Sequence, residues 1–187
     1  MKTNVSSPFK PARQYSYAFM DTPDPETLGV LGTLPGRWGR MPPLSRAMVV
    51  ETGRFLQECP IRPQSFPAGT AKVVGLIGGT ARGSLAPDLD FAATLLEGVN
   101  LASPAIFSYT LANIPLAEAA NHYRLTGPVY AVIDSASPLD AAIREARLLV
   151  RMQPAFHFIL ACAFDDNPGH DREGRLSLTF TLVDNNV

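Results

Sequence analysis

The clearest hydrophobic pattern in the chain predicts a strand, a turn and a helix between residues 127 and 152. Residues 129–133 (VYAVI) are β-branched and aromatic, which is typical of a short buried strand. Ser137 is a residue type preferred at helix N-caps, and Pro138 suits the first helical position. The apolar residues that follow have helical spacing on one face, so the pattern predicts an amphipathic helix.

The rest of the chain repeats these two patterns. Residues 1–27 show no periodicity and predict an N-terminal arm, followed by one domain at 28–187. In the helix predicted at 87–97, Phe91, Ala92, Leu95 and Leu96 are expected to face inward. The other predicted strands are 28–34, 71–77, 156–164 and 175–183, and the other predicted helices are 42–58 and 111–123.

Strands that alternate with helices indicate a parallel sheet with right-handed crossovers. A ten-residue loop joins the last two predicted strands, so we expect that pair to be antiparallel. The predicted fold class is therefore α/β, with a mixed, mostly parallel five-stranded sheet and helices on both faces.

Composition narrows the function classes. The 187 residues carry a net charge of −1, which gives no indication of nucleic-acid or anionic-membrane binding. Cys59 and Cys162 lack metal-ligand spacing, and we expect neither a metal nor a cofactor. The N-terminus has no apolar signal core, and no window is long and apolar enough to span a membrane, so we expect a cytoplasmic protein.

Two local features suggest binding, and each also has a structural interpretation. Residues 78–83 (GGTARG) resemble a phosphate loop but lack its spacing and its lysine, so we expect close backbone packing there. Residues 1–72 hold nine Lys/Arg against five acidic residues, and Arg37, Arg40 and Arg46 lie in this basic part. Two interpretations are open: these arginines form a face that binds an acidic partner, or they are ordinary solvated surface residues.

In order and spacing, residues 28–184 resemble the N-terminal half of a β-ketoacyl synthase, in the thiolase-like superfamily. Four segments carry the resemblance. Residues 39–56, which begin with Gly-Arg-Met, are similar to the family's arginine-methionine helix, and residues 73–98 (VVGLIGGTARGSLAPDLDFAATLLEG) are similar to its strand, Gly-Thr turn and following helix. Residues 103–128 are similar to its Pro-Phe-x-Asn-Thr region and the helix that ends in Gly-Pro, and residues 127–152 are similar to its nucleophile segment.

This resemblance implies one half of a thiolase-like fold, with a vestigial nucleophile turn. Where the family has Thr-Ala-Cys-Ala-Ser, this chain has Ile133, Asp134, Ser135, Ala136 and Ser137, without the cysteine. The family's two active-site histidines and its lysine belong to a C-terminal half that this sequence does not contain. Condensation needs such groups to stabilise the enolate and the oxyanion, so we expect no condensing activity.

The leading hypothesis is a non-catalytic partner or scaffold in fatty-acid or polyketide-type synthesis, similar to a chain-length factor. The resemblance implies a homodimer, or a heterodimer with a ketosynthase, through residues 128–133 and the helix 111–123. The half on its own is expected to expose an apolar helix layer, which favours association. An acyl carrier protein is a further possible partner, through Arg37, Arg40 and Arg46.

The alternative hypothesis is a small serine-dependent acyl-transfer or hydrolytic enzyme that uses Ser135 or Ser137. A serine nucleophile needs an adjacent base. His122 is predicted at a helix end, His157 in an apolar strand and His170 in a loop, so none is close to the turn in sequence. The structural interpretation, in which the two serines cap and pack the helix, is favoured.

Overall fold

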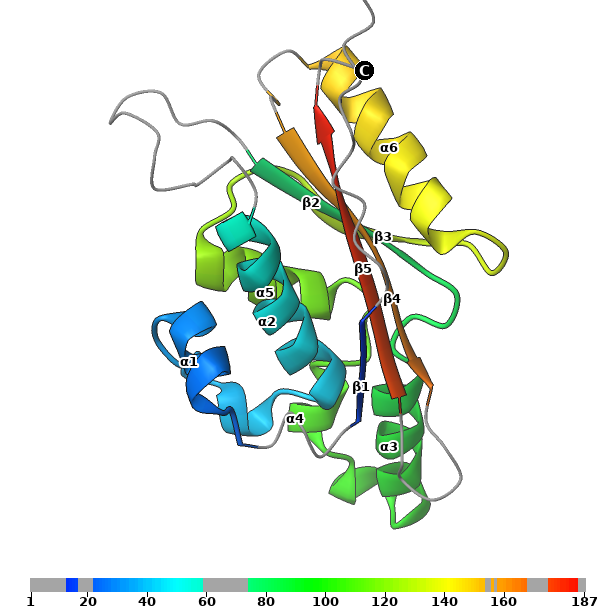
Figure 1. Ribbon diagram of the computed structural model, residues 1–187. Coiled ribbons are helices and arrows are strands. Elements are labelled where there is room, and N and C mark those ends of the chain that lie inside the picture. The colour runs from blue at the N-terminus through cyan, green and yellow to red at the C-terminus, as the bar shows by residue number, and fades with distance from the viewer. Residues whose placement is uncertain are drawn as a thin grey trace, which may run out of the picture.

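The protein is a five-stranded sheet covered by helices on both faces (Figure 1). The computed structural model describes residues 13–16, 22–58, 74–153, 156, 158–167 and 175–184. The strands are β1 (Arg13–Ser16), β2 (Val74–Thr80), β3 (Val129–Ile133), β4 (Phe158–Asn167) and β5 (Arg175–Asp184). The helices are α1 (Pro25–Leu31), η2 (Trp38–Arg40), α2 (Pro43–Glu58), α3 (Leu85–Leu96), η4 (Val99–Leu101), α4 (Pro104–Phe107), α5 (Ile114–Tyr123) and α6 (Pro138–Met152).

The strand order is β1-β5-β4-β2-β3. Strand β2 is parallel to both of its neighbours, β3 and β4, whereas β5 is antiparallel to both β4 and β1. The sheet is therefore mixed, as predicted, but it is not mostly parallel. The difference arises because the fifth strand is β1, which comes from the segment predicted to be an arm and pairs antiparallel with β5.

The strand predicted at 28–34 is wrong, because this segment begins inside α1. The carboxylate of Asp24 accepts a hydrogen bond of 2.7 Å from the amide of Thr27, and Pro25 occupies the first turn of the helix. Gly32 ends the helix at a φ of 69°, a conformation that glycine adopts without strain. The apolar run LGVLGTL predicted a strand, but the Asp-Pro start signal just before it determined the structure.

Two apolar cores form on the two faces of the sheet. On one face, α2 and α5 cover side chains such as Leu76, Leu160 and Phe164. On the other face, α6 packs Ala142, Ala146 and Val150 against the sheet. Helices on both faces of the sheet are therefore confirmed.

Helix α3 departs from the predicted orientation. Pro87 is its buried residue, and the ring of Phe91 packs at a tilt against that of Phe107, with ring centroids 5.2 Å apart. Leu95 and Leu96, predicted to face inward, are 41% and 90% exposed, and Ala92 is exposed as well. The reason is position: α3 contacts α4, η4 and β4 at the end of the sheet, so only a narrow side of it is covered.

Candidate functional site

The carboxyl ends of β2, β3 and β4 lie next to one another at the same end of the sheet, because these strands are parallel neighbours. The amide of Asp134, just after β3, donates to the carbonyl of Thr80 at 3.0 Å. The hydroxyl of Thr80 in turn donates to the carboxylate of Asp165 on β4, at 2.8 Å. Ligands of open α/β sheets commonly bind outside the carboxyl ends of the strands, so this end of the sheet is the first place to look for a site.

Asp134 organises the turn between β3 and α6. Its Oδ1 accepts hydrogen bonds from the amides of Ala136 and Ser137, both at 2.9 Å. Its Oδ2 pairs with the guanidinium of Arg144 at 3.3 Å. The amide of Ser137, with that of Ala136 and with Arg144, holds the pKa of the Asp134 carboxyl below its ordinary value.

The two serines of this turn do not have the capping role that the sequence predicted. Ser137 occupies the N-cap position of α6, but its side chain makes no capping hydrogen bond. Ser135 and Ser137 are both exposed, and Asp134 supplies the acceptor for the turn amides instead. The carboxylate is the stronger acceptor for amide donors at a helix N-terminus, which is the physical reason for this difference.

Acid should loosen this turn. Because the folded-state pKa of Asp134 is lowered, its stabilisation of the turn is present above the ordinary carboxyl pKa and is lost as pH falls through the lowered value. We expect the NMR amide shifts of Ala136 and Ser137 to titrate together, with a midpoint below the ordinary value of about 3.9. Asp134→Asn should abolish this titration. A midpoint at or above the ordinary value would contradict the assignment.

The glycine-rich segment after β2 binds a carboxylate of the protein itself. Asp165 accepts hydrogen bonds from the amides of Ala81, at 3.1 Å, and Arg82, at 3.0 Å. The hydroxyl of Thr80 also accepts from the amide of Gly83, at 2.8 Å. The amides that gave this segment its likeness to a phosphate loop are therefore already paired.

Close packing, the structural interpretation of these glycines, is confirmed. A Cβ at Gly79 would lie 1.7 Å from the carbonyl oxygen of Pro138, in the first turn of α6. A Cβ at Gly78 would point to the opposite face and lie 2.4 Å from the ring of Phe164. The two adjacent glycines thus allow close approach on both faces of β2, and Gly79 sets how near α6 lies to the sheet.

No described histidine lies at the serine turn. The Nε2 atom of His122, at the end of α5, lies 3.0 Å from the carbonyl oxygen of Leu31. Helix α5 ends before β3 begins, whereas the turn follows the other end of that strand. His157, His170 and Cys59 lie outside the described residues. Cys162 is buried in β4, and burial raises the pKa of its thiol, which keeps it protonated and unreactive.

The predicted basic face is only partly a surface. Arg46 is 9% exposed, donates from Nε to the carbonyl of Trp38 at 2.9 Å, and lies 5.8 Å from the centre of the Trp38 ring. It is a packing residue and not part of a docking face, because its guanidinium lies against Trp38 of η2. Arg37 and Arg40 are exposed. The face for an acidic partner is thereby reduced to these two arginines.

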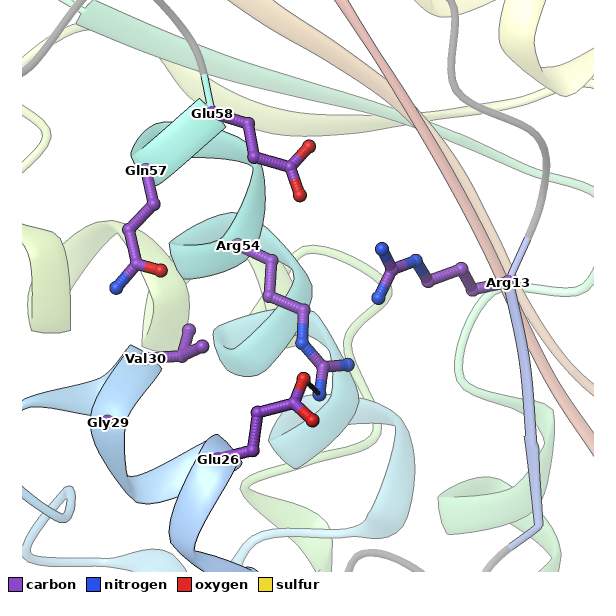
Figure 2. Close-up of a pocket in the computed structure, with 7 residues that line it drawn as sticks. All are labelled: Arg13, Glu26, Gly29, Val30, Arg54, Gln57 and Glu58. Atoms are coloured by element: carbon purple, nitrogen blue, oxygen red, sulfur yellow. Dashed lines mark hydrogen bonds and ion pairs between the residues drawn. The ribbon is translucent and has the colours of Figure 1, made fainter.

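A crevice of about 260 Å³ lies where β1 and α1 meet α2 (Figure 2). Arg54 of α2 pairs with Glu51 at 2.8 Å and with Glu26 of α1 at 3.2 Å, and it also donates to the hydroxyl of Tyr15 on β1. Arg13 of β1 lies 3.6 Å from Glu51. The charged side chains at this crevice therefore pair with one another. We interpret these ion pairs as structural contacts that hold β1 and α1 onto α2, and not as catalytic groups.

A larger groove of about 1030 Å³ lies between the last turns of α1, α2 and α5. His122, Tyr123 and Arg124 line it from α5, at the opposite end of β3 from the Asp134 turn. Neither concavity therefore contains a residue of the predicted nucleophile turn.

Among the described residues, no cluster of His, Cys, Asp or Glu could hold a metal ion. No helix in the same residues is long and apolar enough to cross a membrane.

No family model and no curated protein matches this sequence. Solved structures do match in fold. One is a ketosynthase (ApeO) in complex with its chain length factor (ApeC) from Xenorhabdus doucetiae, with a TM-score of 0.61 at 13% identity over 97% of this chain and 80% of the matched chain. A second, the ishigamide ketosynthase/chain length factor, has a TM-score of 0.63 at 16% identity over 88% of this chain and 49% of that chain.

The chain therefore has a ketosynthase-like, or thiolase-like, fold. A β-ketoacyl synthase from Burkholderia phymatum also matches, with a TM-score of 0.53 at 14% identity over 78% of this chain and 43% of its own. The chain spans less than half of the second and third matched chains. The first match covers 97% of this protein and 80% of the matched ketosynthase structure's chain, so the matched chain is only moderately longer than this protein.

The sequence analysis missed Asp165, the carboxylate that binds the amides of the loop after β2. Nothing in the pattern singled out Asp165, which lies 84 residues beyond the amide of Ala81 that it binds. The available signal was the pair Asp165-Asp166 at the end of an otherwise apolar strand. Acidic residues in such a strand need partners, which identifies them as candidates for a structural or functional role.

Proposed function

We propose that this chain is a non-catalytic, chain-length-factor-like partner of a ketosynthase in fatty-acid or polyketide-type synthesis, acting in the cytoplasm. The main observation behind this proposal is that the backbone amides of the Asp134 turn are already hydrogen-bonded within the chain. Acyl transfer requires amide donors aimed at the developing oxyanion. Here the amides of Ala136 and Ser137 already bind a carboxylate of the chain itself.

The chemistry of the turn supports the same conclusion. The positive end of the α6 dipole would lower the pKa of a thiol, but residues 135–137 contain no cysteine. The negative charge of Asp134 beside these residues would oppose formation of a thiolate or of an oxyanion at this place. A turn with these residues is suited to holding α6 against the sheet, and not to nucleophilic attack.

Strand β3 is the proposed pairing surface. It is the last strand of the sheet on its side, and Ile133 at its end is 73% exposed. The carbonyl of Pro128 accepts from the amide of Leu76 on β2, and the amide of Asp134 donates to Thr80 on the same strand. In a parallel ladder, residues that alternate with these direct their N–H and C=O groups to the open edge. Such an edge is a template for pairing with another strand.

Proline at residue 131 should prevent this pairing. Ala131 lies in the middle of the residues that face the open edge, so Ala131→Pro removes an outward N–H and leaves the ladder with β2 intact. We expect the loss of at least about tenfold in affinity, or about 1.4 kcal/mol, for a ketosynthase encoded beside this chain or for a second copy. Light scattering of the purified chain, alone and mixed with that ketosynthase at micromolar concentration, measures the change.

Ala131→Ser keeps the N–H and serves as the matched control, while far-UV circular dichroism checks the fold of both variants. The proposal fails if the unmodified chain stays monomeric and forms no complex with the ketosynthase. Pairing through β3 fails if Ala131→Pro leaves the measured mass of the complex unchanged.

The serine-dependent alternative gains no support from the site. Its nucleophile, Ser135 or Ser137, is exposed, and the one described histidine contacts Leu31 instead. Labelling of either serine by an acyl-phosphonate probe would favour this alternative over the non-catalytic proposal. Docking of an acyl carrier protein rests on Arg37 and Arg40 alone, and would require salt-sensitive binding that is lost when Arg40 is reversed to glutamate.

A further inference from the structure

Exposed apolar side chains gather on the unit formed by α3, η4 and α4. Among the described residues, twelve large apolar side chains are exposed, and seven of them lie between residues 89 and 111. Leu96 and Val99 are the most exposed of these, at 90% and 81%. We call these residues the α3–α4 surface: Leu89, Leu95, Leu96, Val99, Leu101, Phe107 and Leu111. A gathering of this kind marks an interaction site, whereas isolated exposed leucines do not.

The spacing on α3 is that of a packing face. Leu89, Ala92, Ala93 and Leu96 are exposed at positions i, i+3, i+4 and i+7, which places them on one stripe of the helix. This is the pattern with which a helix normally packs into a groove or against another helix. In α3 the stripe faces away from the protein.

The surface is held in place by its own contacts. The ring of Phe91 packs at a tilt against the ring of Phe107, and this contact joins α3 to α4. The hydroxyl of Ser84, just before α3, donates to the carbonyl of Thr110, just after α4. The amide of Ser103 donates to the hydroxyl of Thr94 at 3.4 Å. The outward stripe is therefore a fixed feature of the fold, and the apolar side chains have little freedom to turn inward.

The charged residues within the segment that carries the stripe, residues 83–123, are all acidic. Asp88 and Asp90 flank its beginning and Glu97 its end, and all three are exposed. From residue 83 to residue 123 the sequence contains no lysine or arginine. An apolar stripe with an acidic rim is complementary to an apolar surface with a basic rim.

This charge pattern separates the possible occupants. A second copy in a two-fold contact would place the same acidic rim on both sides, which is unfavourable. An anionic membrane surface would be repelled. We propose that the α3–α4 surface docks a different protein, one that presents an apolar helix or groove bordered by lysine or arginine. This interface goes beyond the proposed pairing through β3 and does not depend on it.

A pair of model peptides tests the proposal. One is an amphipathic helix of leucine and lysine, about 18 residues long and fluorescently labelled, and the other has glutamate in place of every lysine. The full chain should bind the leucine/lysine peptide at least about tenfold more tightly, and raising NaCl from about 50 to about 500 mM should weaken that binding. Fluorescence anisotropy gives both affinities.

Matched variants assign the binding to the surface. Leu96→Ser with Val99→Ser should weaken binding of the lysine peptide at least about tenfold, since both side chains are exposed and their removal leaves the fold intact. Leu148→Ser, at an exposed leucine of α6, should leave it unchanged. Asp88→Asn with Glu97→Gln should reduce the salt dependence, and Asp140→Asn on α6 should not.

Four results would overturn the proposal. The first is that the chain binds the two peptides equally well, and the second is that Leu148→Ser weakens binding of the lysine peptide as much as the double variant does. The third is that the double variant Leu96→Ser with Val99→Ser lowers the measured mass of the free chain. The fourth is that the unmodified chain binds phosphatidylcholine vesicles and the double variant does not. The third result would make a second copy the occupant, and the fourth a membrane. A chain that no longer pairs through β3, such as Ala131→Pro, should still bind the lysine peptide, so the two proposals fail separately.

Discussion

Replacing Gly79 with alanine is expected to destabilise the folded chain by about 3–5 kcal/mol, a large share of the stability of a single domain. The added Cβ would lie 1.7 Å from the carbonyl oxygen of Pro138 and 2.4 Å from its carbonyl carbon. Both are backbone atoms, so no side-chain rotation relieves the overlap. Either β2 or the first turn of α6 must move by more than an ångström, and with it the Asp134 turn.

Urea unfolding measures the effect as a fall in the midpoint at constant slope. Gly36→Ala is the matched control, because a Cβ at Gly36 meets no atom within 4 Å. The control should change the free energy of unfolding by less than about 0.5 kcal/mol. Equal midpoints for the two variants would show that α6 does not lie as close to β2 as the structure has it.

The sequence predicted most where the signals are local. The bounds of β3 and α6 agree with the predicted 129–133 and 138–152, because the β-branched run, the Ser-Pro start and the helical spacing all lie within the elements themselves. The same local logic would have identified α1 from Asp24, Pro25 and Glu26, but the apolar run after them favoured a strand. Where two local signals conflict, the capping signal is the more specific one.

What could not be predicted depends on contacts between distant segments. Helical periodicity shows that α3 has an apolar stripe, but not whether a layer of the protein covers it. Composition shows a basic N-terminal part, but not that Arg46 turns inward to Trp38 while Arg40 stays exposed. Both differences come from how elements pack, which the pattern within each element does not contain.

The exposed side of α6 also differs from expectation. The resemblance to half of a ketosynthase implied an apolar helix layer open to solvent. On α6, however, the exposed residues include the charged Asp140, Arg144, Arg147 and Arg151. This face is suited to water, whereas the apolar surface lies on α3 and α4. The search for partners should therefore concentrate on the β3 edge and on the α3–α4 surface.

Replacing Asp165 with alanine is the second change with a large expected effect. The carboxylate accepts hydrogen bonds from the hydroxyl of Thr80 and the amides of Ala81 and Arg82. Hydrogen bonds to a charged group contribute about 1.5–3 kcal/mol each, and water replaces part of this at the exposed side of the loop. We expect Asp165→Ala to lower the free energy of unfolding by about 2–4 kcal/mol.

Asp165→Asn keeps one carbonyl oxygen as an acceptor and should lose about half as much, by the same reasoning. Asp90→Ala, at an exposed position of α3, is the control and should change stability by less than about 0.5 kcal/mol. Because the loop from Thr80 to Ser84 leads directly into α3, hydrogen exchange should rise in α3 and α4 before it rises in α6. If Asp165→Ala unfolds no more easily than Asp90→Ala, the carboxylate does not hold the loop. The α3–α4 surface would then owe its position to the Phe91–Phe107 contact and the bond from Ser84 to Thr110.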